Sequence, residues 1–232
     1  MLDFTGRHFQ KELIMQALRW YLSYPLSYRH VEELLKERGV MVDHSTIQRW
    51  VERYGVELEA QFRRRFCKSK SYTSWRMDEI YIKHKGEWVY LYRAIDAQGD
   101  TLDFMVSAKR DETAARAFFK KAIGTHGLPE KVTVDKSGDN HAALITLNCV
   151  LLLMGVWFEK WIEIRQHKYL NNMIEQDHRR IKRLVNPMMG FKSWSSMEST
   201  IVGYEMVQMM RKGQHIHAET MTVWEQFYSL AA

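Results

Sequence analysis

The sequence predicts an α/β protein with a mixed sheet flanked by helices, preceded by an all-α domain of the helix-turn-helix type. Apolar residues at helical spacing fill the first part of the chain, three strand patterns follow from residue 75, and strand and helix patterns then alternate. We expect four segments: a helix-turn-helix domain at 1–62, a basic linker at 63–72, a sheet domain at 73–212 and a C-terminal tail at 213–232.

The composition is that of a soluble globular protein, with 46% apolar and 27% charged residues among 232. Cys67 and Cys149 are too few for a disulfide framework or a four-cysteine zinc site, which favours a reduced, cytoplasmic setting. The longest apolar stretch, 149–158, is about half of the roughly 20 residues that a membrane span needs, so we expect no membrane partner. The net charge of +6 favours a polyanion such as nucleic acid.

Three helices are predicted before residue 63. Apolar spacing favours a helix over 8–22, which Pro25 ends. Ser27 is a suitable N-cap for a second helix that stops at Gly39, and Asp43 is a suitable N-cap for a third. Two short helices joined by a glycine-containing turn form the helix-turn-helix pattern, in which the second helix enters the major groove of DNA.

This interpretation predicts two kinds of DNA contact. The start of the third helix would read base edges, and the residues are His44, Ser45, Gln48 and Arg49, with Arg53 directed to the backbone. Other basic residues would follow phosphates without reading sequence: Arg63, Arg64, Arg65 and Lys68 in the linker, and Arg179, Lys182, Arg183 and Lys192 later in the chain. The alternative is a small helical bundle whose polar faces are only solvated.

The sheet domain is predicted from segments rich in aromatic and β-branched residues. Five such segments are expected as strands: 75–83, 88–95, 101–107, 131–134 and 157–164. The first three are separated by short turns and favour an antiparallel meander. Three helical segments are expected after them: 111–123, 140–153 and a long region from Asn171.

Three acidic residues are notable for their positions. Asp78 lies in the middle of the first strand, on the face that carries Ile80 and Ile82. Asp135 follows the 131–134 strand, at the carboxyl edge of the sheet, and Glu175 lies near the start of the last helical region. Carboxylates converging from two strands and a helix are what a two-metal phosphoryl-transfer site requires, with ions about 4 Å apart.

A basic residue accompanies this acidic set. Lys182 follows Glu175 by two helical turns on the same face, where it could neutralise a phosphate. Each acid also has an ordinary interpretation, because an Asp at a strand end often serves a turn and a Glu near a helix start often serves the helix dipole. A single Glu-x-x-His, formed by Glu175 and His178, is not enough for a di-iron site, which needs a second copy of the motif.

Several motifs occur in an order that resembles a known family. They are FTGRHF and VDHSTIQRWVERYG near the beginning, then WRMDEIYIK, VTVDKSGDN, YLNNMIEQDHRRIKR and GFK. From Gly6 to about Lys212 the chain resembles the DDE transposases of small bacterial insertion sequences, and it is most similar to the group that joins replicons as cointegrates.

The resemblance implies an RNase H-like, integrase-type catalytic core with a five-stranded sheet at 73–212. It implies that Asp78, Asp135 and Glu175 bind two Mg²⁺ or Mn²⁺ ions, that Lys182 assists them, and that the helix-turn-helix domain reads terminal inverted repeats. The implied activity is metal-dependent DNA 3′-end cleavage and strand transfer. The implied partners are double-stranded DNA, at both the element ends and the target, and further copies of this chain as a homodimer or larger oligomer, associated with the bacterial nucleoid.

Some alternatives stay open at this point. The separation between Asp135 and Glu175 is longer than in many relatives, so Asp177 and Glu163 are alternative third ligands. The chain could also be a transposase-derived DNA-binding regulator that has lost catalysis, or a structure-selective nuclease on the same fold. All three acids and Lys182 are present, which favours the transposase.

Overall fold

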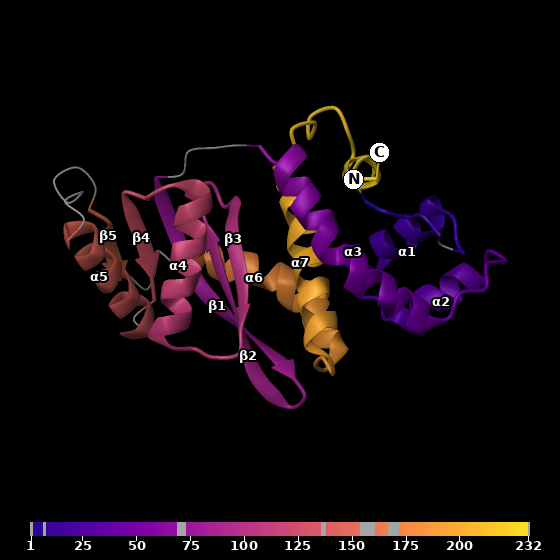
Figure 1. The fold of residues 1–232 in the computed structure, drawn as a ribbon, viewed down its shortest axis with the longest axis horizontal. Coiled ribbons are helices and arrows are strands. Elements are labelled where there is room, and N and C mark those ends of the chain that lie inside the picture. The colour runs from indigo at the N-terminus through magenta and orange to yellow at the C-terminus, as the bar shows by residue number, and fades with distance from the viewer. Residues whose placement is uncertain are drawn as a thin grey trace. The chain divides into compact units, whose positions relative to one another are not determined.

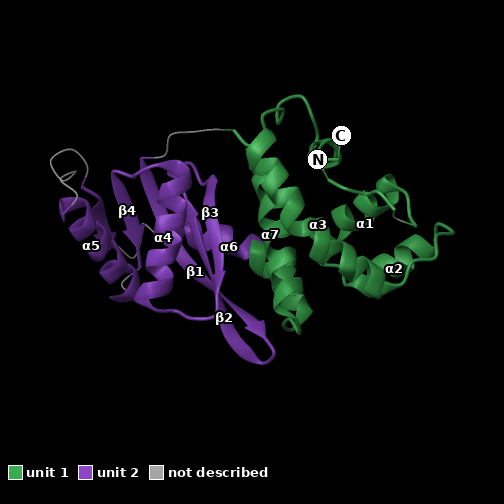
Figure 2. Cartoon of the chain, in the orientation of Figure 1, with its two compact units in different colours: residues 1–68, 181–232 green, residues 69–180 purple. Residues whose placement is uncertain are grey.

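A computed structural model of the chain describes residues 2–6, 8–68, 73–135, 138–153, 161–166 and 172–231 (Figure 1). The chain divides into two compact units (Figure 2). Unit 1 contains residues 1–68 and 181–232, and unit 2 contains residues 69–180.

Unit 2 is built on a mixed sheet with the strand order β3-β2-β1-β4-β5. The strands are β1 (Ser74–His84), β2 (Glu87–Ile95), β3 (Thr101–Ser107), β4 (Lys131–Val134) and β5 (Glu163–Gln166). Strands β1 to β3 form an antiparallel meander, whereas β4 pairs in parallel with both β1 and β5. This is the RNase H-like arrangement, so the predicted fold class is confirmed.

The predicted strand positions agree closely with the structure for β1 to β4. The hairpin between β1 and β2 turns at Lys85 and Gly86, both with positive φ (50° and 88°), a geometry that matches the right-handed twist of the two strands. The fifth strand begins at Glu163, later than expected. The first part of its expected range, 157–160, lies outside the described residues.

Different helices contact the two faces of this sheet. Helices α4 (Glu112–His126) and α5 (Gly138–Leu153) pack together. Their apolar residues join Trp75, Met77 and Tyr92 in one buried cluster on that face. On the other face, Arg93 of β2 binds Asp177 of α6 (Asn172–Val185), a helix whose residues up to Arg180 belong to unit 2. Because side chains alternate along a strand, neighbouring residues of β1 serve different faces.

The regular elements that the structure describes in unit 1 are all helices, and the end of α6 from Ile181 on is one of them. The unit also contains α1 (Lys11–Ser23), α2 (Tyr28–Lys36), α3 (His44–Arg65), a 3₁₀ turn (Asn186–Met188), α7 (Trp194–Arg211) and α8 (Val223–Ser229). Helix α3 passes close to α7 at Gly55, where an added Cβ would lie 2.5 Å from the Ser199 carbonyl oxygen. None of the described helices has the length and hydropathy that crossing a membrane requires.

The predicted caps of α2 and α3 are confirmed. The Ser27 hydroxyl accepts a hydrogen bond from the His30 backbone N–H, and the Asp43 carboxylate accepts one from the Ser45 N–H. Gly39, in the left-handed region at φ 77°, lies in the turn between the two helices. Two helices joined by a short glycine-containing turn therefore stand where the helix-turn-helix pattern predicts them.

The compact units divide the chain at points other than the expected boundaries. The expected linker begins inside a helix, because Arg63 to Arg65 form the last turn of α3, while 69–72 lie outside the described residues. The expected sheet domain, 73–212, divides between the units at 180/181. The reason is that α7 is buried along most of its length by α1, α3 and α8.

The segment expected as a tail, 213–232, is also part of unit 1. Its backbone pairs with the end of α3, since the Lys68 N–H donates to the Gln214 carbonyl at 2.8 Å. It then forms α8, and Phe227 and Leu230 are fully buried there. Burial of these apolar side chains holds the segment in the unit.

Candidate active site

Two of the three expected acids meet where β1 and β4 run side by side. Arg76 pairs with Thr133 in the parallel register, and two residues further along the chain are Asp78 and Asp135. Carboxylate oxygens of Asp78, Asp135 and Glu79 lie within 4.8 Å of one another. The parallel pairing of two strands thus builds an acidic cluster, which includes one residue that the sequence analysis did not select.

Glu175, the third expected acid, lies near this cluster but is not part of the close group. It is exposed in the first turn of α6, and its charge is one of those that raise the pKa of Asp78. Two neighbours attach this helix to the sheet. Asp177 accepts a hydrogen bond from the buried Arg93 at 2.8 Å, and Nδ1 of His178 lies 3.7 Å from Oδ2 of Asp78.

The other possible third ligands have different neighbours. Asp177 forms a buried ion pair with Arg93, which lies opposite Asp78 in the β1–β2 register. Glu163 is exposed on β5 and forms an ion pair with Arg165 at 2.7 Å. Both carboxylates are engaged by arginines, whereas the charge of Glu175 acts on Asp78, so these contacts favour Glu175.

The acidic cluster carries negative charge in a partly buried place. Burial, together with the charges of Glu79, Asp135 and Glu175, raises the pKa of Asp78 to about 7, against a hydrogen bond from the Glu79 backbone that lowers it. Burial also raises the pKa of Glu79, opposed by a hydrogen bond from Asn140 and by the charge of Arg110. Divalent cations with oxygen ligands would relieve this repulsion, so the residues present fit Mg²⁺ or Mn²⁺.

The expected base-reading residues occupy the first turns of α3. Ser45, Arg49 and Arg53 are exposed, and the Arg49 guanidinium donates to the Thr46 hydroxyl at 2.9 Å and to the Ser45 carbonyl at 3.3 Å. Arg53 lies 3.7 Å from Asp3. Gln48 lies partly buried on the same helix and, together with Lys192, lines a cavity of about 310 Å³ in unit 1.

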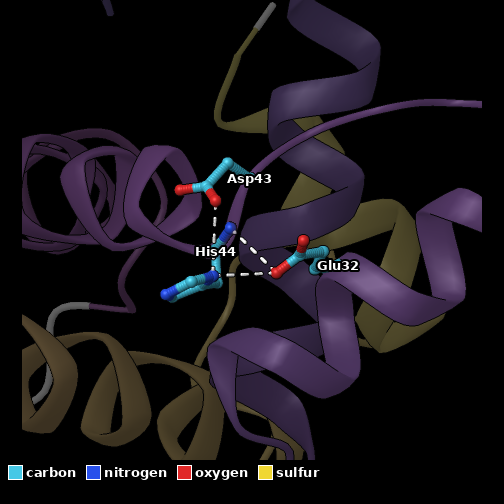
Figure 3. A group of neighbouring side chains, drawn as sticks. All are labelled: Glu32, Asp43 and His44. Atoms are coloured by element: carbon cyan, nitrogen blue, oxygen red, sulfur yellow. Dashed lines mark hydrogen bonds and ion pairs between the residues drawn. The ribbon is translucent and has the colours of Figure 1, made fainter.

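His44 is held at the start of α3 by two acids (Figure 3). Oε2 of Glu32 accepts the His44 backbone N–H at 3.1 Å and lies 2.9 Å from its Nδ1, which is 3.4 Å from Asp43. The other ring nitrogen points away from both acids. These groups are close enough to hold a metal ion, but the carboxylates already accept N–H groups of a helix N-terminus, whose dipole disfavours a cation. We interpret the group as a cap that orients His44.

The remaining basic residues lie on α3 and α6 or just beyond them. Arg63 forms an ion pair with Glu59 one turn earlier, Arg64 is exposed, and the Arg65 guanidinium lies 5.2 Å from the Phe66 ring centre. Lys68 follows the end of α3. Three further residues are exposed on α6: Arg179 in unit 2, and Lys182 and Arg183 in the part of the helix that belongs to unit 1.

Comparison with known proteins assigns the family. The DDE-domain model of IS240-type transposases matches residues 72–214. A Staphylococcus aureus transposase for the insertion sequence-like element IS431mec is 40% identical over 209 residues, which cover 90% of this chain and 88% of the relative. The chain belongs to the DDE transposases of insertion sequences. A second S. aureus transposase, for IS257 in transposon Tn4003, is 39% identical with the same coverage.

Solved structures share only a distant likeness with this transposase. The HTLV-2 integrase catalytic core in complex with magnesium is 18% identical, covers 51% of this chain and 72% of its own, and has a TM-score of 0.38. The Drosophila P element transposase strand transfer complex is 11% identical, covers 97% and 64%, and also has a TM-score of 0.38. The assignment therefore rests on the sequence matches, which make the chain a DNA-transposing enzyme of a family that depends on divalent metal ions.

The sequence analysis did not select several residues of this region. Glu79 was not considered, although the Asp-Glu dipeptide in a strand was a visible signal; period-two alternation puts it on the face of β1 opposite Asp78. Arg93 and Arg110 gave no local signal. Their roles come from contacts with Asp177 and with the acidic cluster, each many residues away in the chain.

Proposed function

We propose that the transposase binds the terminal inverted repeats of its element and uses Asp78, Asp135 and Glu175 to hold two Mg²⁺ or Mn²⁺ ions for DNA 3′-end cleavage and strand transfer. The observation that supports this most directly is the meeting of Asp78 and Asp135 across β1 and β4, within the electrostatic reach of Glu175. Two strands distant in sequence thereby build the acidic cluster, and α6 carries Glu175 near it.

Each part of the cluster has a role in this proposal. Asp78 and Asp135 present carboxylate oxygens from adjacent strands, and Glu175 adds a third carboxylate from α6. When bound, the metal ions would supply the Lewis acid that an in-line phosphoryl transfer needs at its attacking and leaving oxygens. The protein provides no covalent nucleophile in this scheme, and Lys182 neutralises a DNA phosphate.

The DNA contacts in the proposal come from exposed and partly buried residues. His44, Ser45, Gln48 and Arg49 read base edges from α3, while Arg53, Arg64 and Arg65 contact phosphates. Arg63, Lys68, Arg179, Arg183 and Lys192 complete the phosphate contacts in the proposal. Two or more copies of the chain act together on double-stranded DNA of the nucleoid.

A strand-transfer assay tests the proposed function. The substrate is a duplex that ends in the short inverted repeat flanking the coding region, incubated with a target plasmid and Mg²⁺ or Mn²⁺. A transposase joins the duplex end to the plasmid, a nuclease cuts without joining, and a regulator only binds. A duplex with a scrambled end is the matched control. If cleavage without joining is the outcome, the nuclease replaces the transposase as the function of this chain.

The Arg49→Ala variant is expected to lose sequence preference. An arginine that reads a guanine edge contributes about 1–3 kcal/mol of discrimination, so affinity for the cognate end should fall about tenfold more than affinity for scrambled DNA. Fluorescence anisotropy at one fixed salt concentration measures both affinities. Arg53→Ala is the control, with a similar loss on both duplexes. Equal losses for Arg49→Ala would make Arg49 a phosphate contact.

Metal binding is expected to weaken below neutral pH. Because the pKa of Asp78 is about 7, protons compete with a metal ion for its carboxylate as the pH falls through that value. The raised pKa also means that the folded, metal-free protein binds more protons than the unfolded chain between pH 4 and 7. Ionisation of Asp78 therefore lowers stability as the pH rises through about 7, and a bound cation reverses this loss.

Thermal unfolding at several pH values checks this expectation. The rise in Tm on adding Mn²⁺ should be larger at pH 8 than at pH 6. In Asp78→Asn the difference between the two pH values should be smaller, because that side chain no longer ionises. An equal rise at both pH values in the unmodified protein would contradict the expectation.

A further inference from the structure

Glu79 is a fourth carboxylate at the acidic cluster, and it is not one of the three acids proposed to bind metal ions. It follows Asp78 but projects from the other face of β1, opposite Tyr92, and its residue is only 6% exposed. Its Oε1 accepts a hydrogen bond from the Asn140 amide at 2.9 Å. A buried carboxylate is stable only when it is paired, and here it lies beside two further acids.

Arg110 is the cation that pairs with Glu79. Its Nη2 lies 3.5 Å from Oε2 of Glu79 and 3.5 Å from Oδ2 of Asp135. Its Nη1 donates to the Tyr81 hydroxyl at 3.0 Å, and the guanidinium carbon lies 5.8 Å from the centre of that ring. About a quarter of the arginine side chain (26%) stays exposed. The guanidinium is thus held by an aromatic ring and two acids, with part of it open to solvent.

The backbone around Arg110 is also well defined. It stands between β3 and α4, directly before Asp111, the N-cap of α4. The Asp111 carboxylate accepts the Ala114 N–H at 2.8 Å, which fixes the chain where it enters the helix. The arginine is therefore placed by local capping as well as by its partners.

A guanidinium at this position opposes metal binding, because it competes with a divalent cation for Asp135. It favours the binding of a phosphodiester, since the planar N–H fork of arginine matches the oxygens of a phosphate group. Glu79 is suited to keep Arg110 at the cluster when Asp135 binds a metal ion, because Glu79 is buried and separately anchored by Asn140.

We infer that Arg110 is a catalytic residue that binds a non-bridging oxygen of the DNA phosphodiester at the acidic cluster, and that Glu79, Asn140 and Tyr81 position it. This inference rests on the proposed function, because it takes the cluster of Asp78 and Asp135 as the place where DNA reacts. It adds a phosphate-binding group to the three metal-binding acids.

Two measurements on Arg110→Gln test the inference. Single-turnover strand transfer is measured on the inverted-repeat duplex, and Mn²⁺ binding is measured by titration calorimetry of the full chain without DNA. Loss of one preorganised group that stabilises transition-state charge lowers a rate by about 100-fold or more, and we expect a loss of that size. Mn²⁺ affinity should be equal to or higher than that of the unmodified protein, because a competing cation has been removed.

Three further variants make the test specific. Arg116→Gln removes an exposed arginine from α4 and should leave both measurements unchanged. Arg110→Lys keeps the charge and should retain more strand transfer than Arg110→Gln. Glu79→Gln should slow strand transfer while Mn²⁺ binding persists.

The inference is overturned if Arg110→Gln transfers strands within twofold of Arg116→Gln. It is also overturned if Arg110→Gln loses Mn²⁺ affinity in parallel with activity, which would indicate a purely structural role. Loss of Mn²⁺ binding in Glu79→Gln would make Glu79 a metal ligand and contradict its positioning role. If the unmodified protein binds the inverted repeat but joins no DNA, the proposed function itself fails, and the assignment of Arg110 fails with it.

Discussion

The Asp78→Asn variant is expected to lose strand transfer by a factor on the order of 10³ or more, while its binding to inverted-repeat DNA stays nearly unchanged. Asp78 lies at the centre of the acidic cluster, close to Asp135 and within the electrostatic reach of Glu175. An amide has nearly the same shape but carries no negative charge for a metal ion. The proposed DNA-reading helix is in unit 1 and is not altered by the substitution.

The measurement pairs a strand-transfer time course with an anisotropy titration on the same duplex. Asp135→Asn and Glu175→Gln should behave in the same way. Glu163→Gln is the matched control, because it makes the same carboxylate-to-amide change at an exposed residue of β5 that lies outside the cluster. Any of the three acids whose variant transfers strands at the normal rate is thereby removed from the metal-binding set.

The Arg93→Met variant is expected to lose about 3–5 kcal/mol of unfolding free energy. Its guanidinium is almost fully buried and lies 2.8 Å from Asp177, whose side chain is only 9% exposed. Removing one partner leaves the other charge buried without compensation. Because Asp177 lies two residues after Glu175, we also expect the variant to impair strand transfer by displacing the third acid.

Urea unfolding and strand transfer together separate these two effects. The double variant Arg93→Met/Asp177→Leu should recover most of the stability, since an apolar pair can replace a buried ion pair, but it should recover less of the activity. Arg165→Met is the control, because its ion pair with Glu163 is exposed and should contribute no more than about 1 kcal/mol. A loss for Arg93→Met no larger than that of the control would show that the buried pair does not stabilise α6.

Sequence patterns were sufficient for the features that depend on near neighbours in the chain. Ser27 and Asp43 were recognised as N-caps because a cap bonds to an N–H two or three residues later. The first four strands were located because alternation and turn residues are visible over a few positions. Asp78 and Asp135 were selected for the same reason, since each holds a recognisable place within or just after a strand.

Other features were decided only when distant elements packed together. The sequence analysis did not select Glu79, and nothing near it in the chain showed that its carboxylate would reach the cluster of Asp78 and be paired with Arg110. It did not show that Arg93 would bind Asp177, 84 residues later, nor that α7 would pack with the amino-terminal helices. Periodicity and capping report which side of its own element a residue occupies. Whether a buried charge is paired, and which helices group together, depends on which other elements pack against that side. The tertiary structure decides that packing.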